Sequence, residues 1–281
     1  MIGFNYLGKM GQLGNQMFQY AALRGIAKNR NLDFCIPYHN EVFTDSLGNK
    51  LRIELFEPFV LKSLKQSNIG VIQNDNPRTE GQFNFNETLY NNCPDNVSLH
   101  GYFQTEKYFK NAEKLIRLDF RFKRTIQERV NNHFKDYLAD KPVCLIVRDF
   151  NPEFDYPNCE NNHINIPLEF YQKSIERLGK DRTYIVMSNS IEKCKNIFKG
   201  NNFIFNEVVP EDIYKGHFDL CLMSKCQDFI VSNTTFGWWG AWLGNGEGKR
   251  VILPTPWYGP GLSHINTDDL YPQEWEKIKC K

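Results

Sequence analysis

The chain has 281 residues, of which 41% are hydrophobic and 24% are charged, and its formal net charge at pH 7 is +1. This is the balance of an ordinary globular protein, and it gives no reason to expect a nucleic-acid partner. The length allows one large α/β domain or two domains of roughly 130 to 150 residues, and either can bury a core.

Membrane and export signals are missing from the sequence. The first residues lack a basic stretch followed by an apolar one, and no apolar run approaches the ~18 residues of a membrane span. The eight cysteines contain no Cys-x-x-Cys pair or zinc-like spacing, which favours buried free thiols in a reducing compartment. We therefore expect a cytoplasmic protein without a transmembrane segment, and peripheral association with a membrane surface is left open.

The N-terminal stretch reads as a strand, a turn and a helix. Residues Ile2–Leu7 can form the strand, and the helix is expected from about Gln16 to Lys28. Gly8, Gly11 and Gly14 lie three apart in the turn between them. Such a turn lets the backbone approach a ligand closely, although a plain tight turn is an equal alternative. It matches neither the dinucleotide fingerprint nor a phosphate-binding Gly-Lys-Ser/Thr loop.

The middle of the chain contains the predicted domain boundary. Residues 66–96 are rich in Asn, Asp, Gln and Pro, which indicates long surface loops. A helix is predicted at about 124–137, and Ala139-Asp-Lys-Pro142 is the best linker candidate. The expected domains are residues 1–140 and 141–281.

After Pro142 the pattern is regular. Apolar strands alternate with amphipathic helices, which predicts a parallel, Rossmann-like sheet. The expected strands are 143–147, 184–187, 203–205, 229–231 and 251–253, the last of the chain, and the expected helices include 167–178, 211–225 and 236–243.

Polar residues follow three of these strands. They are Arg148, Ser188-Asn189 and Ser232-Asn-Thr-Thr235. Ligands of parallel sheets bind at the carboxyl ends of the strands, and a helix N-terminus favours an anion. Residues 232–235 could also do no more than cap the following helix. The convergence of the three sites favours an anionic, nucleotide-linked ligand.

Four stretches carry a family resemblance. They are Gly11-Gln-Leu-Gly-Asn-Gln-Met-Phe-Gln-Tyr-Ala21, Gly101-Tyr-Phe-Gln-Thr-Glu-Lys-Tyr-Phe109, Asp219-Leu-Cys-Leu-Met-Ser224 and Ser232-Asn-Thr-Thr-Phe-Gly-Trp-Trp-Gly-Ala-Trp-Leu243. The chain resembles the α-1,2-fucosyltransferases of glycosyltransferase family 11. The resemblance implies a GT-B-type α/β fold, with two Rossmann-like domains facing a cleft. An acceptor-side N-terminal domain would face a C-terminal domain that holds GDP-fucose. It also implies transfer to a glycan hydroxyl with inversion, without a cofactor or metal, and no Asp-x-Asp motif is present.

The resemblance also assigns residues. Thr234 and Thr235 are expected on the donor phosphates, Ser188 and Asn189 near the nucleoside, and Asn15 facing the donor across the cleft. The full expected donor-binding set is Gly14, Ser188, Asn189, Ser232, Asn233, Thr234, Thr235 and Phe236. Arg148 and Asn15 are the expected catalytic residues, and no metal ligand is expected.

One motif departs from the family. Where the family has His-x-Arg-Arg-Gly-Asp-Tyr, this chain reads Leu145-Ile-Val-Arg-Asp-Phe150. Arg148 remains and could stabilise the leaving pyrophosphate, because a guanidinium can bind two oxygens and stays charged; a surface salt bridge is the alternative role. Asp149 is a weak candidate for the general base, which the sequence does not identify. The altered motif also leaves open a different nucleotide sugar or a non-catalytic relative.

Overall fold

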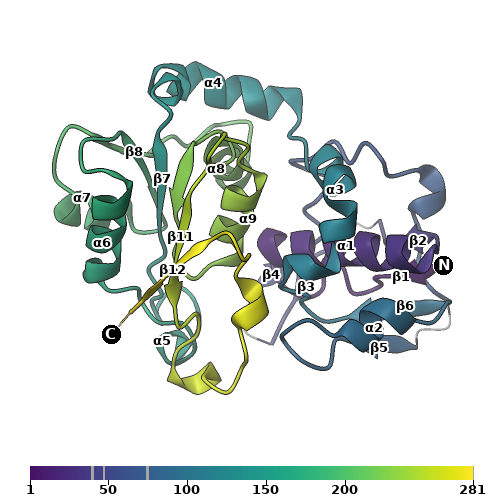
Figure 1. Ribbon diagram of the computed structural model, residues 1–281. Coiled ribbons are helices and arrows are strands. Elements are labelled where there is room, and N and C mark those ends of the chain that lie inside the picture. The colour runs from purple at the N-terminus through teal and green to yellow at the C-terminus, as the bar shows by residue number, and fades with distance from the viewer. Residues whose placement is uncertain (39–40, 47, 74–75, 281) are drawn as a thin grey trace. The chain divides into compact units, whose positions relative to one another are not determined.

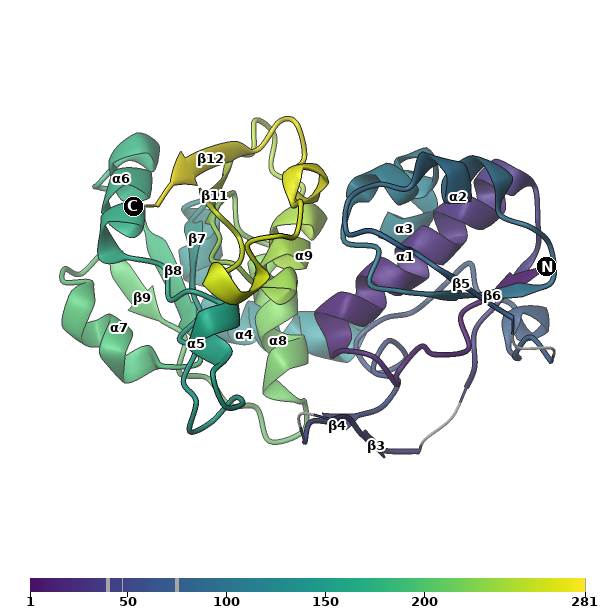
Figure 2. The ribbon, with the colours of Figure 1, turned by 90° about the horizontal axis from the view of Figure 1, so that it is seen from below.

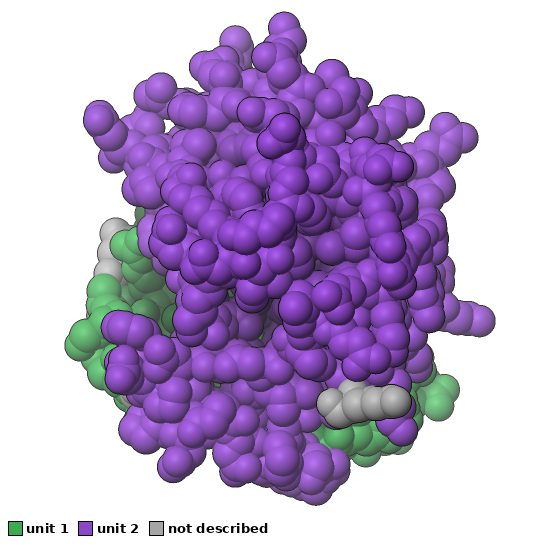
Figure 3. All heavy atoms as spheres, turned by 90° about the vertical axis from the view of Figure 1, so that its left-hand side faces the viewer, with its two compact units in different colours: residues 1–123, 265–272 green, residues 124–264, 273–281 purple. Residues whose placement is uncertain are grey.

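The computed structural model describes residues 1–38, 41–46, 48–73 and 76–280. The chain forms two compact units, coloured separately in Figure 3. Unit 1 comprises residues 1–123 and 265–272, and unit 2 comprises residues 124–264 and 273–281. The division falls between Lys123 and Arg124, whereas the sequence pattern predicted a boundary after residue 140. The helix at Arg124–Ala139 therefore belongs to unit 2.

Unit 1 contains a parallel sheet with the strand order β2-β1-β6-β5. Its strands are β1 (Ile2–Gly3), β2 (Phe34–Cys35), β5 (Pro77–Thr79) and β6 (Val97–His100), and β3 (Phe43–Thr44) pairs with β4 (Lys50–Leu51) in a separate antiparallel hairpin. The strand expected at residues 2–7 is shorter than predicted, because the chain turns from Asn5 onward.

Helix α1 (Leu13–Arg30) runs through the core of unit 1 (Figures 1 and 2). A Cβ at Gly25 would lie 1.9 Å from the backbone oxygen of Tyr108, so only glycine permits this close packing. The helix begins three residues earlier than predicted, which places Gly14 and Asn15 in its first turn rather than in the loop. The other helices of unit 1 are α2 (Glu87–Asn92), α3 (Glu113–Asp119) and the 3₁₀ turns η1 (Gln66–Asn68), η2 (Glu106–Tyr108), η3 (Lys110–Ala112) and η5 (Asp268–Leu270).

Unit 2 is built on a six-stranded parallel sheet with the order β12-β11-β10-β7-β8-β9, which confirms the predicted Rossmann-like pattern. Its strands are β7 (Val143–Val147), β8 (Tyr184–Ser188), β9 (Phe203–Phe205), β10 (Asp228–Ile230), β11 (Val251–Thr255) and β12 (Glu276–Lys279). The prediction that 251–253 is the last strand of the chain is wrong. Pro254 lies inside β11, and β12 pairs beside it.

Helices cover both faces of this sheet (Figures 1 and 2). Helix α6 (Leu168–Leu178) packs on one face through Phe170, Tyr171 and Leu178. The helices of unit 2 are α4 (Arg124–Ala139), α5 (Cys159–Asn162), α6 (Leu168–Leu178), α7 (Ile191–Ile197), α8 (Lys215–Met223), α9 (Thr235–Leu243) and the 3₁₀ turn η4 (Pro260–Leu262). The helix predicted from residue 211 begins only at Lys215. Among the described residues, none of the helices is long and apolar enough to cross a membrane.

Candidate functional site

The carboxyl edge of the unit 2 sheet brings together the polar residues that follow its strands. β10 pairs with β7, and β7 pairs with β8, so Arg148, Asn189 and Ser232 all emerge at one edge. The chain order reverses between β7 and β10, because β8 and β9 continue to one side of β7 while β10 to β12 lie on the other. Such a switch point is where parallel sheets usually bind ligands.

The turn before α9 presents both buried and open polar groups. Ser232 is fully buried, and its Oγ has no hydrogen-bond partner among the residues that the structure describes. Asn233 Nδ2 donates to the backbone oxygens of Ile164 (3.0 Å) and Trp257 (3.1 Å), which anchors the turn. Thr234 and Thr235 are half-buried, and the Thr234 side chain makes no capping hydrogen bond within the described chain. The Thr234 side chain therefore does not cap the backbone N–H groups at the start of α9, which weakens the capping alternative for residue 234.

Arg148 is already engaged within unit 2. Its guanidinium forms an ion pair with Asp155, and its Nη1 donates to the Asp149 backbone oxygen at 2.9 Å. The guanidinium also lies over the Phe150 ring, 4.7 Å from its centroid. The side chain is 27% exposed, so the salt-bridge alternative is realised here in a partly buried form. A phosphate ligand would have to share this guanidinium with Asp155.

Two asparagines hold the stretch from Arg148 to Phe150, which we call the Arg148–Phe150 segment. Asn189 Oδ1 accepts from the Asp149 N–H (2.9 Å), and its Nδ2 donates to the Asp149 oxygen (2.8 Å). Asn165 makes the same two bonds to Phe150, at 2.7 and 2.9 Å. Each side-chain amide thus makes the pair of hydrogen bonds that a neighbouring β-strand would make, because it accepts from a backbone N–H and donates to a backbone oxygen. Asn189 was predicted near a nucleoside, but its amide groups contact the protein backbone.

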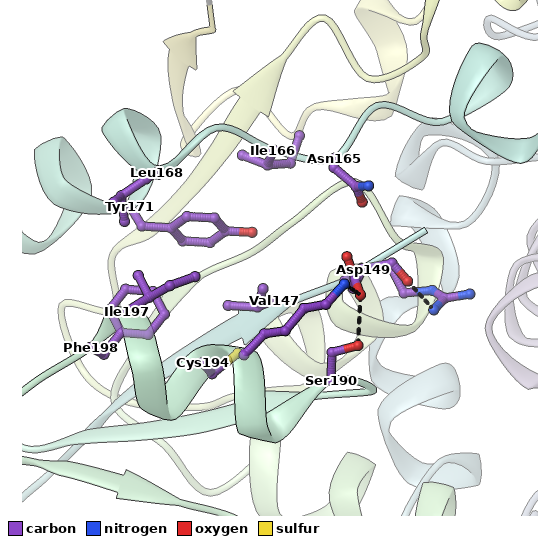
Figure 4. A pocket seen from close by; sticks show the side chains of 12 residues that line it. Val147, Asp149, Asn165, Ile166, Leu168, Tyr171, Ser190, Cys194, Ile197 and Phe198 are labelled. Atoms are coloured by element: carbon purple, nitrogen blue, oxygen red, sulfur yellow. Dashed lines mark hydrogen bonds and ion pairs between the residues drawn. The ribbon is translucent and has the colours of Figure 1, made fainter. Parts of the chain in front are cut away.

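A pocket of about 120 Å³ opens beside this segment, between α6 and α7 (Figure 4). One water molecule needs only about 10–15 Å³ of cavity volume, so the pocket can hold a ring-sized group. Its lining residues are Val147, Arg148, Asp149, Asn165, Ile166, Leu168, Tyr171, Ser190, Lys193, Cys194, Ile197 and Phe198. The walls are largely apolar, and the polar atoms gather at the end where Asp149 and Ser190 lie.

Asp149 carries the negative charge of the pocket. Its Oδ2 accepts from Ser190 Oγ (2.7 Å) and Lys193 Nζ (2.5 Å). Partial burial opposes ionisation of this carboxyl, but the hydrogen bonds from Lys193 and Ser190 outweigh it and lower the pKa of Asp149 below its ordinary value. Opposite, the Tyr171 ring points into the pocket, and its buried hydroxyl has no partner among the described residues. The carboxylate and the hydroxyl offer hydrogen bonds to a polar planar ligand.

His163 joins the same region from the loop after α5. Its ring stacks on Phe150 with centroids 4.8 Å apart and an interplanar angle of 15°. Burial, followed by the positive charge of Arg148, lowers the pKa of His163, so the ring stays neutral at pH 7. No sequence motif points to His163, Asn165, Tyr171 or Lys193. Tyr171 lies on the buried apolar face of α6, where its spacing does not distinguish a functional residue from a core residue.

In unit 1, two of the family-like stretches meet. Asn15 lies in the first turn of α1, where its Oδ1 accepts from Gln104 Nε2 at 2.9 Å. Gly11 has a φ of +74°, and a Cβ there would lie 2.3 Å from Asn15 Nδ2. Glycine is therefore required for the turn to wrap around Asn15. Gly14 is buried in the same helical turn.

Within the described residues, no cluster of three or more His, Cys, Asp or Glu side chains could hold a metal ion.

Comparisons with solved structures identify the fold. POFUT1 in complex with GDP is similar with a TM-score of 0.54 at 11% identity, covering 90% of this chain and 97% of that one. A mutant of FUT1 from Arabidopsis thaliana in complex with GDP has a TM-score of 0.52 at 12% identity, covering 93% and 72%. The chain has the α/β fold of these GT-B-type fucosyltransferases.

Comparisons of sequence identify the family. The O-antigen biosynthesis glycosyltransferase WbnK of Escherichia coli is 27% identical over 92% of this chain and 96% of its own length. An alpha-1,2-colitosyltransferase of Escherichia coli is 25% identical over 96% and 97%. A galactoside 2-alpha-L-fucosyltransferase of Caenorhabditis elegans is 23% identical over 96% and 75%. The pattern of glycosyl transferase family 11 matches residues 2–279, and the chain belongs to that family.

Proposed function

We propose that this glycosyltransferase moves L-fucose from GDP-fucose to a hydroxyl of a glycan, forming an α-1,2 linkage with inversion and without a metal. The observation that carries the proposal is the start of α9 at the switch point of the sheet, with Ser232 buried before it and the half-buried Thr234 and Thr235 beside it. Support for the sugar and the linkage comes from the names of the family relatives, two of which specify transfer to a 2-position by an α linkage.

The reaction we propose is a direct displacement. The acceptor oxygen forms a bond to the anomeric carbon while the bond from that carbon to the β-phosphate oxygen breaks, and the acceptor proton passes to a base. Negative charge grows on the departing GDP, so fixed positive groups beside it lower the barrier. The N–H groups at the start of α9 and the guanidinium of Arg148 would supply these groups, with Arg148 shared between Asp155 and the phosphate.

The pocket beside the Arg148–Phe150 segment suits the base of the donor. Guanine offers adjacent N–H donors on one edge, and the ionised Asp149 offers acceptor oxygens. The apolar walls formed by Val147, Ile166 and Phe198 would cover the faces of the ring. We therefore place guanine in this pocket and the pyrophosphate toward α9. Gly14 and Asn15 remain predicted donor contacts from unit 1.

The first test is calorimetric titration with GDP. Wild type should bind with micromolar affinity, and Arg148→Ala should bind at least about tenfold more weakly, which is about 1.4 kcal/mol or more. Arg129→Ala serves as the matched control, because Arg129 forms an exposed pair with Asp212. Absence of GDP binding in the wild type would refute the donor assignment.

A second candidate differs in the sugar. The colitosyltransferase relative favours a test with GDP-colitose beside GDP-fucose, and the donor with the higher kcat/KM is then the substrate. The Arg148–Asp155 pair and the missing second arginine favour a non-catalytic alternative as well. Tight GDP binding without turnover of either donor would support that alternative.

A further inference from the structure

Glu80 is a buried acid in unit 1 that the proposed reaction does not use. The residue directly follows β5 and is only 6% exposed. Its backbone N–H donates to the His100 oxygen at 2.9 Å, which extends the β5–β6 pairing by one step. The carboxyl group therefore lies at the carboxyl end of β6, where the family-like stretch from Gly101 begins.

The carboxyl holds the backbone that follows β6, which we call the Gly101–Gln104 segment. Glu80 Oε2 accepts from the N–H groups of Tyr102 (3.1 Å) and Phe103 (2.8 Å). The segment needs such support, because Phe103 has a φ of +54° and Gly101 a φ of +151°. A non-glycine residue at positive φ persists only where its surroundings impose it. A Cβ at position 101 would lie 2.7 Å from Glu80 Cβ, so the two residues are in close contact.

The Gly101–Gln104 segment in turn contacts the start of α1. Gln104 Nε2 donates to Asn15 Oδ1 at 2.9 Å, and Gln19 Nε2 donates to the Gly101 oxygen at 3.2 Å. The Gly101–Gln104 segment thus connects the two residues, because it is hydrogen-bonded to Glu80 through its backbone and to Asn15 through the Gln104 side chain. The family resemblance assigns Asn15, together with its neighbour Gly14, to the donor.

The surroundings of Glu80 favour its protonated form. Burial raises the pKa of Glu80 to about 8, although the two backbone hydrogen bonds work in the opposite direction. The titratable group beside it is Tyr108, whose pKa is raised first by burial and then by charge on Glu80 and on Asp269. Asp269 itself is paired with Lys107. Within the described residues, Oε1 of Glu80, Gln19 and Gln104 are three buried acceptors without a partner.

We infer that Glu80 is a positioning residue, which fixes the Gly101–Gln104 segment so that Gln104 keeps Asn15 in its working orientation. The catalytic part of this inference rests on the proposed function. The segment should be held best when Glu80 is a neutral acid, because an ionised carboxylate would be buried without a cation. Activity should therefore decline as the pH rises through about 8, the pKa of Glu80.

The test compares Glu80→Gln, Glu80→Ala and the control Glu113→Gln in the full-length chain. Glu113 is a half-exposed acid of the same unit, paired with Arg117. Glu80→Gln keeps an acceptor oxygen and cannot ionise, so it should retain wild-type transfer at pH 7 within about threefold and lose the decline near pH 8. Glu80→Ala should lower kcat/KM about tenfold or more, mainly through kcat, while GDP affinity stays within about twofold.

Amide hydrogen exchange supplies a readout that needs no activity. Exchange in the peptide containing Tyr102 and Phe103 should be at least about tenfold faster in Glu80→Ala than in wild type. In wild type, exchange of this peptide should also accelerate between pH 7 and 9 by more than the intrinsic exchange rate rises with pH. Glu80→Gln should show neither acceleration. If the protein proves inactive with GDP-fucose, the proposed function fails and exchange still decides the role of Glu80. The inference is overturned if Glu80→Ala exchanges and reacts like wild type, or if Glu80→Gln keeps the alkaline decline.

Discussion

The two units use different chemistry to hold the backbone segments that follow β6 and β7. In unit 1, a buried carboxyl from Glu80 accepts two N–H groups of the Gly101–Gln104 segment. In unit 2, two neutral amides from Asn165 and Asn189 each donate to and accept from the Arg148–Phe150 segment. One segment depends on a group that titrates, and the other depends on groups that do not.

This difference follows from what each side chain can offer. An amide satisfies both an N–H and a C=O of the backbone, whatever the pH. A carboxylate only accepts, and burial without a cation makes its charged form costly. Unit 2 instead places its carboxylate, Asp149, beside Lys193 and Ser190, which keep it ionised. The comparison predicts pH sensitivity near neutrality in unit 1 and pH insensitivity in the unit 2 segment.

The largest expected effect is an increase in the free energy of unfolding in Glu80→Gln. Glu80 binds its proton more tightly in the folded chain, with a pKa of about 8 against an ordinary value of 4.5. Its contribution to stability is full below pH 4.5 and is lost as the pH rises to about 8, because the unfolded chain ionises first. The glutamine variant should therefore gain stability over wild type across this interval, on the order of 4 kcal/mol by pH 8. Denaturant melts at pH 5 and pH 8 measure the gain, and an equal difference at both pH values would contradict it.

A smaller effect is expected from removing both amides of unit 2. The double variant Asn165→Ala/Asn189→Ala removes the side-chain amide hydrogen bonds from four backbone groups of the Arg148–Phe150 segment. The Asp149 oxygen still accepts from Arg148 Nη1, and water can replace part of the remaining loss because the region is partly open. GDP affinity should fall about tenfold to thirtyfold, with each single variant losing about threefold to fivefold. The loss should be the same at pH 6 and pH 8.5. Calorimetry at both pH values provides the measurement. A loss of GDP affinity that occurs only at high pH would show that a titrating group supports the segment in unit 2, which contradicts the comparison.

The sequence predicted the frame of unit 2 well. Its strands are apolar runs separated by amphipathic helices, so the period of the pattern located β7, β8 and α6. Strand β12 (Glu276–Lys279) escaped prediction because it lies at the sheet edge, where alternate residues face solvent and carry charge. The sequence also located the polar strand ends, since these follow directly from the strands. The family motifs placed Asn15 and Gln104 in separate stretches without showing that they touch.

Of the three residues that hold the segments, Asn189 was a predicted site residue with a different expected role, whereas Asn165 and Glu80 were beyond sequence reasoning. Asn165 lies in a loop and Glu80 at a strand end, and each acts on backbone far away in the chain. An isolated Asn or Glu in a polar stretch has no pattern that distinguishes a buried hydrogen-bonding role from solvent exposure. The engagement of Arg148 by Asp155 was foreseen only as a salt-bridge alternative, because the partner comes from the loop after the strand. Such contacts depend on tertiary packing rather than on local periodicity.

The smallest expected effect is a loss of GDP affinity in Asp149→Asn. This variant tests the charge of Asp149 separately from the hydrogen bonds that hold its backbone. Asp149→Asn removes the charge that faces Lys193 but leaves the bonds from Asn189 to the backbone in place. GDP affinity should fall only about threefold to fivefold, with GDP losing more than UDP, because the carboxylate would read the donor edge of guanine. The charge is present above the lowered pKa of Asp149 and is lost only as the pH falls through that value, so wild-type affinity should not change between pH 6 and pH 8 on its account. Lys193→Met is the matched control, since it keeps the carboxylate and removes its cation. Equal losses of GDP and UDP affinity in Asp149→Asn would show that the charge supports the pocket without reading the base.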